Sequence, residues 1–473
     1  MEQSLAQLSI KDAATKLQAG EITSVDLTRA CLVEIQKRNP SLNAYLEVFA
    51  DAEAQAKAAD ERRAQGESGA LLGIPLAIKD NILIEGRTAS AASKMLENYT
   101  ATYDATVIKK LKDAGVVFLG RTNMDEFALG GSTENSAFGV TRNPADETRV
   151  AGGTSGGSAA AVAAHMALGA LGSDTGGSVR NPASFCGVVG LKPTYGSVSR
   201  AGLMAAVSSF DQVGPLTKTV ADAKLLFEVL HGQDVLDSTS TPENQYPTRA
   251  LHKKIGVPRH LLAEGVDVTV RAAFDQTLAE MEKQGFEIVD VTLPSLSFAL
   301  AAYYITNFAE VSSNLSRFDG VRYGLSQKGD SLFADYAKSR GEGFGAEARR
   351  RIMLGTYVLS AGYYDAFYGK ATAARAQLAK ELSAVLQTVD AIATPTMPFP
   401  AFVIGEKSDP LSMYVADIFT VTANLTGNPA LSVPMHPVMQ GGVALPVGIQ
   451  YIAAHGAEET LFTLGGLIEK SSL

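Results

Sequence analysis

Apolar and polar positions follow two different periods along the first part of the chain. Between residues 24 and 38, apolar Leu27, Cys31 and Ile35 recur at a spacing of four, which predicts an amphipathic helix capped by Ser24. By the same patterns we expect further helices over 51–65 and 106–114, and strands within 73–86 and 115–120. Such an alternation of helices and strands is typical of α/β folds.

The rest of the chain continues this alternation with one polar interruption. The stretch QDVLDSTSTPENQYPTRA (233–250) has the composition of a linker or an excursion from the fold. Beyond it we expect helices near 265–284 and 345–385 and short strands at 286–292, 389–394 and 444–452. We see no internal repeat. The pattern therefore predicts one large α/β domain over residues 1–473, with an N-terminal helical segment over about 1–66.

Composition narrows the classes of function. The 473 residues carry a formal net charge of −9, and 46% of them are hydrophobic, which is ordinary for a globular chain. Nucleic-acid binding depends on clustered Lys and Arg, so we expect none here, and we interpret RRRIM (349–353) as a solvated helix face. Cys31 and Cys186 are too few for a disulfide framework or a CxxC metal site.

We find no sequence motif for targeting, membrane insertion or metal binding. MEQSLAQLSIKD (1–12) has no basic segment that leads into an apolar one, so we expect no signal peptide. The longest apolar run, near 159–172, is interrupted by His165 and is shorter than the roughly 20 residues of a membrane helix. The two cysteines fit a reducing cytosol, so we expect a cytoplasmic protein. The chain has no HExxH or paired-carboxylate motif, so we expect that it needs no metal.

The first candidate for chemistry is the glycine- and serine-rich cluster AGGTSGGSAAAVAAH (151–165). It could be a flexible linker, a phosphate-binding loop, or a turn that presents a nucleophile. The alanine run after Ser158 is a strong helix former, which places the cluster at a helix N-terminus and not between domains. A phosphate loop needs a lysine after its last glycine, and none follows here.

GTSGG (153–157) also matches GxSxG, the nucleophile elbow of α/β-hydrolases. That motif needs a preceding strand, and NPADETRV (143–150) is a poor strand. It also needs a later acid and histidine, and none of the six histidines has a distinctive glycine- or aspartate-rich setting. This alternative stays open as the weaker one.

Lys79 is a second candidate base. In PLAIKDN its ammonium follows an apolar strand, where burial would lower its pKa and make the neutral amine accessible near neutral pH. From this run alone, pairing with Asp80 or exposure to solvent is the simpler interpretation. A second cluster, GSDTGGSVRNP (172–182), changes that balance, because consecutive glycines let backbone N–H groups approach a substrate oxygen while Ser178 closes the turn.

Together these motifs resemble the amidase signature family, whose members use a Ser–cis-Ser–Lys triad. The resemblance extends over roughly residues 5 to 468 and rests on long, ordered motifs: GIPLAIKDN, GGTSGGSAAAVAA, GSDTGGSVRNPASFCGVVGLKPTYG and SSFDQVGPLTKTVADA. It implies an amide-hydrolysing enzyme with one domain, built on a twisted mixed sheet with helices on both faces.

The family's roles can be carried over residue by residue. The resemblance implies that Ser178 is the nucleophile that forms an acyl-enzyme and that Lys79 is the base. It also implies an oxyanion hole made by four backbone N–H groups, those of Thr175, Gly176, Gly177 and Ser178.

The bridging hydroxyl of the triad falls on residue 154, where this chain departs from the family. The usual motif reads GGSSGG, whereas this chain has Thr154, which keeps the hydroxyl but adds a methyl group and a stiffer side chain. We expect Thr154 to relay protons between nucleophile and base, and neighbouring Ser155 to point elsewhere. Ala145 and Ala151 also depart from the pattern, which has Trp and Pro at these positions.

Later blocks resemble one branch of the family, the A subunits of aminoacyl-tRNA amidotransferases, which act on Glu-tRNA(Gln) and Asp-tRNA(Asn). These blocks are YYITNFAEVSSNLSRFDGVRYG, RRIMLGTYVLSAGYYDAFY and DPLSMYVADIFTVTANLTGNPALSVP. The branch implies glutamine as substrate, with Arg351 binding its α-carboxylate and Asp417 its α-ammonium. Tyr303 would line the same pocket, and Gly130 and Gly131 complete the substrate-binding set.

The same branch implies partners. A B subunit would bind tRNA, a small C subunit would lie at the interface, and ATP and magnesium would be used by a partner, so that this chain itself needs no cofactor. Two other functions remain open: a stand-alone amidase for small amides, aryl amides or carbamates, and a catalytically silent assembly scaffold.

Overall fold

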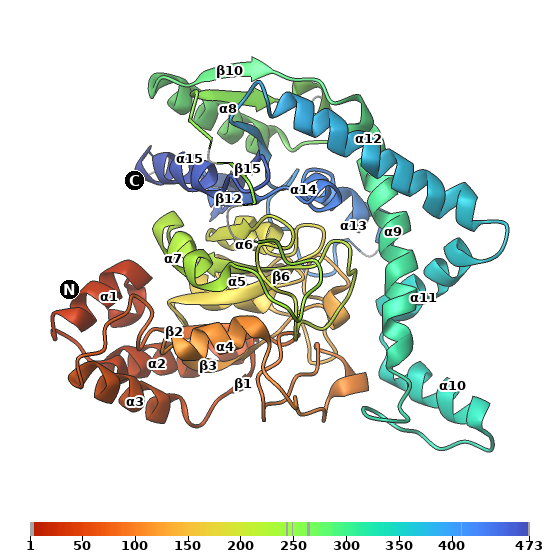
Figure 1. The fold of residues 1–473 in the computed structure, drawn as a ribbon, viewed down its shortest axis with the longest axis horizontal. Helices are drawn as coiled ribbons and strands as arrows, with labels where there is room; N and C mark the ends of the chain where they lie inside the picture. The colour runs from red at the N-terminus through yellow and green to blue at the C-terminus, as the bar shows by residue number, and fades with distance from the viewer. Residues whose placement is uncertain (1–3, 243–244, 248, 263–264, 408, 472–473) are drawn as a thin grey trace.

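The protein is built on one mixed sheet of eleven strands (Figure 1). The computed structural model describes residues 4–242, 245–247, 249–262, 265–407 and 409–471. In sheet order the strands are β1 (Tyr45–Val48), β3 (Val117–Thr122), β2 (Pro75–Lys79), β6 (Gly169–Asp174), β8 (Gln212–Thr217), β7 (Val189–Lys192), β12 (Ala430–Pro434), β15 (Gly448–Ala453), β11 (Ala391–Pro395), β9 (Lys254–Val257) and β10 (Glu287–Asp290). This sheet confirms the α/β fold expected from the sequence.

The strand directions explain where a site can form. β2 pairs in parallel with β3 and β6, and β9 pairs in parallel with β10 and β11, whereas the strands between β6 and β11 pair antiparallel. Since β2 and β6 are parallel neighbours, their carboxyl ends meet at one edge of the sheet. Those ends are Lys79 and Asp174, so the lysine lies beside the start of the second glycine-rich cluster.

Helices flank the sheet, although some of them pack on other helices and not on the sheet itself. They are α1 (Ile10–Gln18), α2 (Ser24–Leu42), α3 (Ala52–Ala64), α4 (Thr106–Asp113), α5 (Gly156–Ala163), α6 (Arg180–Cys186), α7 (Val220–Leu230), α8 (Val268–Lys283), α9 (Ala299–Asn314), α10 (Leu332–Gly343), α11 (Ala346–Leu359), α12 (Lys370–Val385), α13 (Pro410–Tyr414), α14 (Val421–Thr426) and α15 (Glu458–Ser471). In Figure 1, α9 to α12 run along the side of the molecule opposite the N-terminal helices.

Both faces of the sheet are covered, as expected. Leu431 and Val433 of β12 lie against Gly465 of α15. Ser432, between them, lies with Ser184 of α6 beside Gly448. Because neighbouring residues of a strand point to opposite faces, α15 and α6 cover opposite sides of the sheet.

The N-terminal segment differs from its expected form in two respects. Besides α1, α2 and α3 it contributes β1, an edge strand that pairs antiparallel with β3. The cap of α2 is Thr23 and not Ser24: the Thr23 hydroxyl accepts the Asp26 N–H, and the Asp26 carboxylate accepts the Thr23 N–H. Ser24 is the first helical residue, and its hydroxyl donates to the Gly73 carbonyl at 2.8 Å, which ties α2 to the segment before β2.

Three further expectations need correction. NPADETRV contains a strand after all, since β4 (Arg142–Asn143) and β5 (Asp146–Val150) form a small antiparallel hairpin outside the main sheet. The helix near 345–385 is two helices, α11 and α12. The strand near 444–452 is also divided, into β14 (Val443–Leu445), which pairs with β13 (Val438–Gln440), and β15. Among the described residues no helix is both long and apolar enough to cross a membrane.

Candidate active site

Lys79 ends β2 in the interior of the protein with none of its surface exposed. Its Nζ lies within hydrogen-bond distance of three hydroxyls, those of Thr154 at 2.7 Å, Ser155 at 2.8 Å and Ser173 at 2.9 Å, and of the Ser173 carbonyl at 3.2 Å. Asp80 does not pair with it; its carboxylate forms an ion pair with Arg121 at 3.0 Å. The lysine is therefore a buried amine that hydroxyls surround.

This environment controls the protonation of Lys79. Burial lowers the pKa of Lys79 to about 7, although the carboxylates of Asp125, Asp174 and Asp211 act in the opposite direction. In the described part of the chain no carboxylate forms an ion pair with Nζ. The neutral amine is consequently populated near neutral pH, as a general base requires.

The first glycine-rich turn brings Thr154 to the lysine. The Gly153–Thr154 peptide bond is cis, as the resemblance implies. A side chain at Gly153 would collide with the Asp125 carboxylate and with the backbone of Gly131 and Ser132, so only glycine fits there. This close packing places the turn directly against the Gly131–Ser132 segment.

Ser155 lies differently from the expectation. Its hydroxyl contacts Lys79 at 2.8 Å, only 0.1 Å longer than the Thr154 contact, instead of pointing elsewhere. Its N–H donates to the Ser178 carbonyl at 3.1 Å, which joins the two glycine-rich turns. Among the described residues no hydrogen bond connects the Ser178 hydroxyl to either Thr154 or Ser155.

The second turn is organised by Asp174. Its carboxylate accepts the N–H groups of Gly177 at 2.9 Å and Val179 at 3.2 Å, and it pairs with Arg180 at 2.9 Å. Burial acts to raise the pKa of Asp174, but the Arg180 guanidinium, the Asn424 amide and Lys192 together outweigh burial and hold the pKa well below its usual range. The carboxylate is thus a permanent anion that fixes the shape of this turn around Ser178.

This arrangement alters the expected oxyanion hole. The Gly177 N–H is already bound to Asp174, so it is not free to meet a substrate oxygen. The N–H groups of Thr175, Gly176 and Ser178 make no hydrogen bond within the described residues, and they are the donors that the turn can offer. Ser178 itself is buried, with 7% of its surface exposed.

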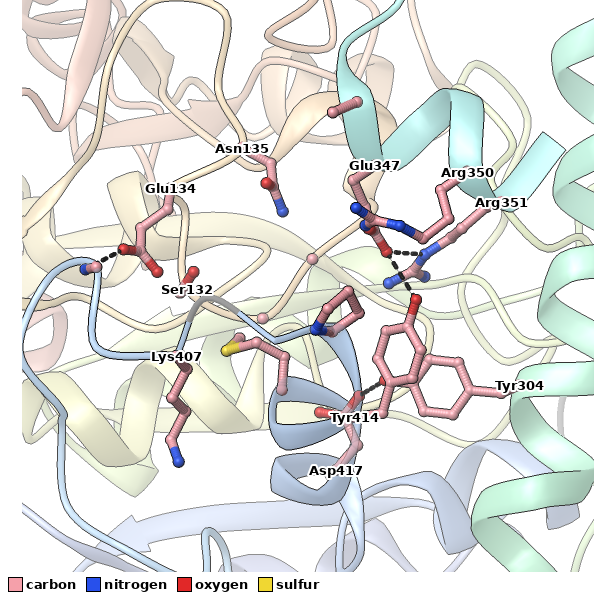
Figure 2. Close-up of a pocket in the computed structure, with 16 residues that line it drawn as sticks. Ser132, Glu134, Asn135, Tyr304, Glu347, Arg350, Arg351, Lys407, Tyr414 and Asp417 are labelled. Atoms are coloured by element: carbon pink, nitrogen blue, oxygen red, sulfur yellow. Dashed lines mark hydrogen bonds and ion pairs between the residues drawn. The ribbon is translucent and has the colours of Figure 1, made fainter. Parts of the chain in front are cut away.

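A cavity of about 250 Å³ lies next to these turns (Figure 2). Four of the five predicted substrate-binding residues line it: Gly130, Gly131, Arg351 and Asp417. The fifth, Tyr303, is not on its wall; the adjacent Tyr304 takes that place. Gly131 and Ser132 form one side of the cavity, so the cavity borders the Thr154 turn.

Three charged groups on the cavity wall are paired with one another, those of Glu347, Arg350 and Arg351. Figure 2 shows Glu347 between Arg350 and Arg351, and its carboxylate also accepts the Tyr414 hydroxyl at 3.2 Å. Arg351 is 3% exposed and donates through Nε to Glu347 at 2.7 Å. RRRIM is therefore not simply a solvated face, because Arg351 points inward to the cavity.

Asp417 faces the same space. Tyr304 donates its hydroxyl to the Asp417 carboxylate at 2.6 Å, and burial raises the pKa of Asp417 to about 7. The cavity thus offers a guanidinium on one side and a titratable carboxylate on the other. Those are the groups that a free amino acid would need.

Known proteins share this chain's sequence and fold. The sequence profile of the Amidase family matches residues 26–462. The chain belongs to the amidase family. It is 49% identical to the A subunit of glutamyl-tRNA(Gln) amidotransferase from Desulfatibacillum aliphaticivorans, over 99% of this chain and 98% of the relative. It is 50% identical to the protein of the same name from Chlorobium phaeobacteroides, over 98% of this chain and 99% of the relative.

Solved structures of related proteins have the same fold as this chain. The A subunit of glutamyl-tRNA(Gln) amidotransferase from Thermotoga maritima superposes with a TM-score of 0.82 at 42% identity, covering 100% of this chain and 96% of that one. The native peptide amidase of Stenotrophomonas maltophilia superposes with a TM-score of 0.81 at 30% identity, covering 98% of this chain and 96% of that one. The proteins similar to this chain therefore include an amidotransferase subunit and a peptide amidase.

Several residues of the amidase site were not found by sequence reasoning. Glu347 stands four residues before Arg351 on α11, a spacing that brings side chains together on a helix, and this signal was available. Asp211 accepts the Thr175 hydroxyl at 2.7 Å, and Thr420 donates to the Gly176 carbonyl, but no local pattern indicates either contact. They come from segments far apart in the chain.

Proposed function

We propose that this amidase hydrolyses the side-chain amide of glutamine with Ser178 as nucleophile, Thr154 as proton bridge and Lys79 as base. The observation that carries the proposal is the buried Lys79 amine, which contacts hydroxyls and forms no ion pair among the described residues. Its pKa of about 7 supports a base that is neutral at physiological pH.

In the first half of the reaction Ser178 attacks the amide carbonyl. Its proton passes to Thr154, and the Thr154 proton passes to the lone pair of Lys79, so that no charge is left on the serine oxygen. The carbonyl oxygen becomes an oxyanion, and the N–H groups of Thr175, Gly176 and Ser178 are placed to stabilise it.

Collapse of this intermediate breaks the carbon–nitrogen bond. The ammonium of Lys79 returns its proton through Thr154 to the leaving nitrogen, which departs as ammonia and leaves an acyl-enzyme on Ser178. Water then attacks the ester with the same proton relay, which releases glutamate and restores the serine. Glutamine and water are consumed, and glutamate and ammonia are formed.

The cavity supports recognition of a free amino acid. Arg351 would bind the α-carboxylate through the guanidinium edge that Glu347 leaves available, and Asp417 in its ionised form would bind the α-ammonium. Tyr303 would act from behind the oxyanion turn and not as part of the cavity wall.

We further propose that the ammonia is used by partner subunits. The relatives are named as A subunits of a glutamyl-tRNA(Gln) amidotransferase, which supports a complex with further subunits. In that complex a B subunit would bind Glu-tRNA(Gln) or Asp-tRNA(Asn), and a small C subunit would lie at the interface. ATP and magnesium would be used by the partner, and this chain would need no cofactor and bind no nucleic acid directly. The free, buried Cys31 and Cys186 fit a cytoplasmic setting.

A stand-alone amidase is the second candidate, supported by the likeness to a peptide amidase. One experiment separates the candidates. The purified wild-type protein and Ser178→Ala are given glutamine, or butyramide, which has the same amide without the charged groups, and ammonia release is measured together with the protein's mass. We expect a glutamyl adduct on the wild-type protein and none on Ser178→Ala.

The possible outcomes are distinct. Release of ammonia from butyramide but not glutamine, by the protein alone and with co-expressed partners, would favour the stand-alone amidase. Unimpaired hydrolysis by Ser178→Ala would refute the assigned nucleophile. If neither substrate, nor an aryl amide or a carbamate, is hydrolysed under any of these conditions, the scaffold is favoured.

A further inference from the structure

A chain of buried side chains connects the cavity to the turn that carries Ser178. Arg351 donates through Nη1 to the Asn307 side-chain oxygen at 3.1 Å. The Asn307 side-chain amide donates in turn to the Tyr303 hydroxyl at 3.2 Å. That hydroxyl lies so close to Gly176 that a Cβ there would collide with it. Three contacts therefore lead from the guanidinium on the cavity wall to a peptide of the candidate oxyanion hole.

Asn307 is the member of this chain that contacts both ends. It is 1% exposed and stands four residues after Tyr303 on α9, so the two side chains lie on one face of that helix. A guanidinium can only donate, so Arg351 takes the amide oxygen of Asn307 and leaves the amide nitrogen for Tyr303. A side chain with only a donor or only an acceptor could not make both contacts in this way.

Gly176 is held from a second direction. Thr420 donates its hydroxyl to the Gly176 carbonyl, and its own N–H donates to the Asp417 carbonyl at 3.1 Å. Tyr303 is buried and stacks on Phe210 with ring centroids 5.6 Å apart. Gly176 is thus held between Thr420, which binds its carbonyl, and the Tyr303 hydroxyl, which lies against its Cα, so a shift of either one would move the residue whose N–H is a candidate oxyanion donor.

We propose that Asn307 is a positioning residue, which orients Arg351 on one side and keeps the Tyr303 hydroxyl against Gly176 on the other. One side chain therefore influences both substrate binding and oxyanion stabilisation. This inference rests on the proposed glutaminase function for its Arg351 half. Its Gly176 half applies to any amide substrate, because every amide forms an oxyanion at the same place.

The test uses Asn307→Leu, which keeps a similar volume but removes both hydrogen bonds. We expect the KM for glutamine to rise about tenfold, because Arg351 loses one of the bonds that orient it. We also expect kcat to fall about 10- to 100-fold for both glutamine and butyramide, because displacement of a catalytic group has effects of this size. If Asn307 had a purely structural role, Asn307→Leu would lower the midpoint of thermal unfolding. It would not raise the KM for glutamine while lowering kcat for both substrates.

Two further variants complete the design. Tyr303→Phe keeps the ring and removes only the hydroxyl, so it should lower kcat for both substrates and change the KM for glutamine less than Asn307→Leu does. Ser312→Ala is the matched control: it removes another α9–α11 hydrogen bond, to Thr356 at 3.0 Å, on the exposed side of the helices. We expect wild-type kinetics from Ser312→Ala.

Each outcome decides the proposal. If Asn307→Leu and Tyr303→Phe are folded and keep the wild-type kcat for butyramide, the proposal is overturned, whatever happens to glutamine. The same holds if Ser312→Ala reproduces their effects. If the wild-type protein hydrolyses butyramide but not glutamine, the glutaminase proposal fails separately, and the butyramide kcat still decides the role of Asn307.

Discussion

Lys79 and Arg351 are both buried cations, but their surroundings act on them in opposite directions. Lys79 is 0% exposed and Arg351 is 3% exposed. Around Lys79 there are hydroxyls and a carbonyl, and burial lowers its pKa to about 7. Burial alone would also lower the pKa of Arg351, but the Glu347 carboxylate at 2.7 Å and the surrounding tyrosines together outweigh burial and raise it.

This difference separates two tasks within one site. A base must give up its proton and take it back, so a lysine without a carboxylate partner suits the reaction centre. A residue that binds a carboxylate must stay charged, so an arginine with a permanent counter-charge suits the cavity wall. Both cations are buried, and they differ in that Glu347 forms an ion pair with Arg351, whereas no carboxylate of the described residues forms one with Lys79.

We expect the largest effect on glutamine hydrolysis from the removal of the Arg351 side chain. Loss of one member of a desolvated charge pair costs about 2–5 kcal/mol of binding, which corresponds to roughly 30- to 5,000-fold in affinity. Arg351→Ala should therefore lower kcat/KM for glutamine by that factor and that for butyramide far less. Arg350→Ala is the comparison variant, since Arg350 contacts the same Glu347 from a more exposed position and should cost less. Equal glutamine hydrolysis by Arg351→Ala and wild type would contradict the glutamine site.

The next effect concerns the hydroxyls on Lys79. Thr154→Ala should slow turnover by about 100-fold, the scale of a lost general acid–base contact, because the proton path from Ser178 is interrupted. Ser155→Ala should have a smaller effect on kcat, although its hydroxyl lies equally close to Lys79. Steady-state rates of both variants with butyramide provide the measurement. The reverse ranking would show that Ser155 is the bridge.

The sequence predicted the reaction centre better than the cavity. Lys79, Thr154 and Ser178 lie on continuous motifs next to two strands, and the resemblance that these motifs carry implied a shared site; the structure brings Thr154 to Lys79 at 2.7 Å. The Thr23 cap and the β4–β5 hairpin rest on local contacts, so their signals were available in the sequence. The edge strand β1 was missed because its pairing with the distant β3 determines it. Signals of that kind are weak in a short window of sequence.

The cavity shows the same limit at the level of single residues. Tyr303 and Tyr304 are adjacent, and sequence could not decide which one faces the cavity, since that depends on how α9 packs against α11 and α13. The Gly177 N–H was counted as an oxyanion donor because nothing local shows that Asp174 turns back to bind it. The role of Asn307 follows from its contacts with Arg351 and Tyr303, and the sequence alone does not show these contacts.

The pH dependence of butyramide hydrolysis tests the central claim most directly, because this substrate avoids the Asp417 titration. Lys79 acts when neutral, so kcat/KM should be constant above about pH 7 and fall about tenfold per pH unit below it. Asp125 and Asp211, whose pKa values burial raises to about 6, would steepen the fall only at lower pH. A break near pH 7 is the predicted result. A rate that stays constant down to about pH 5, or a break near the ordinary lysine pKa of about 10.4, would contradict a buried neutral Lys79 as the base.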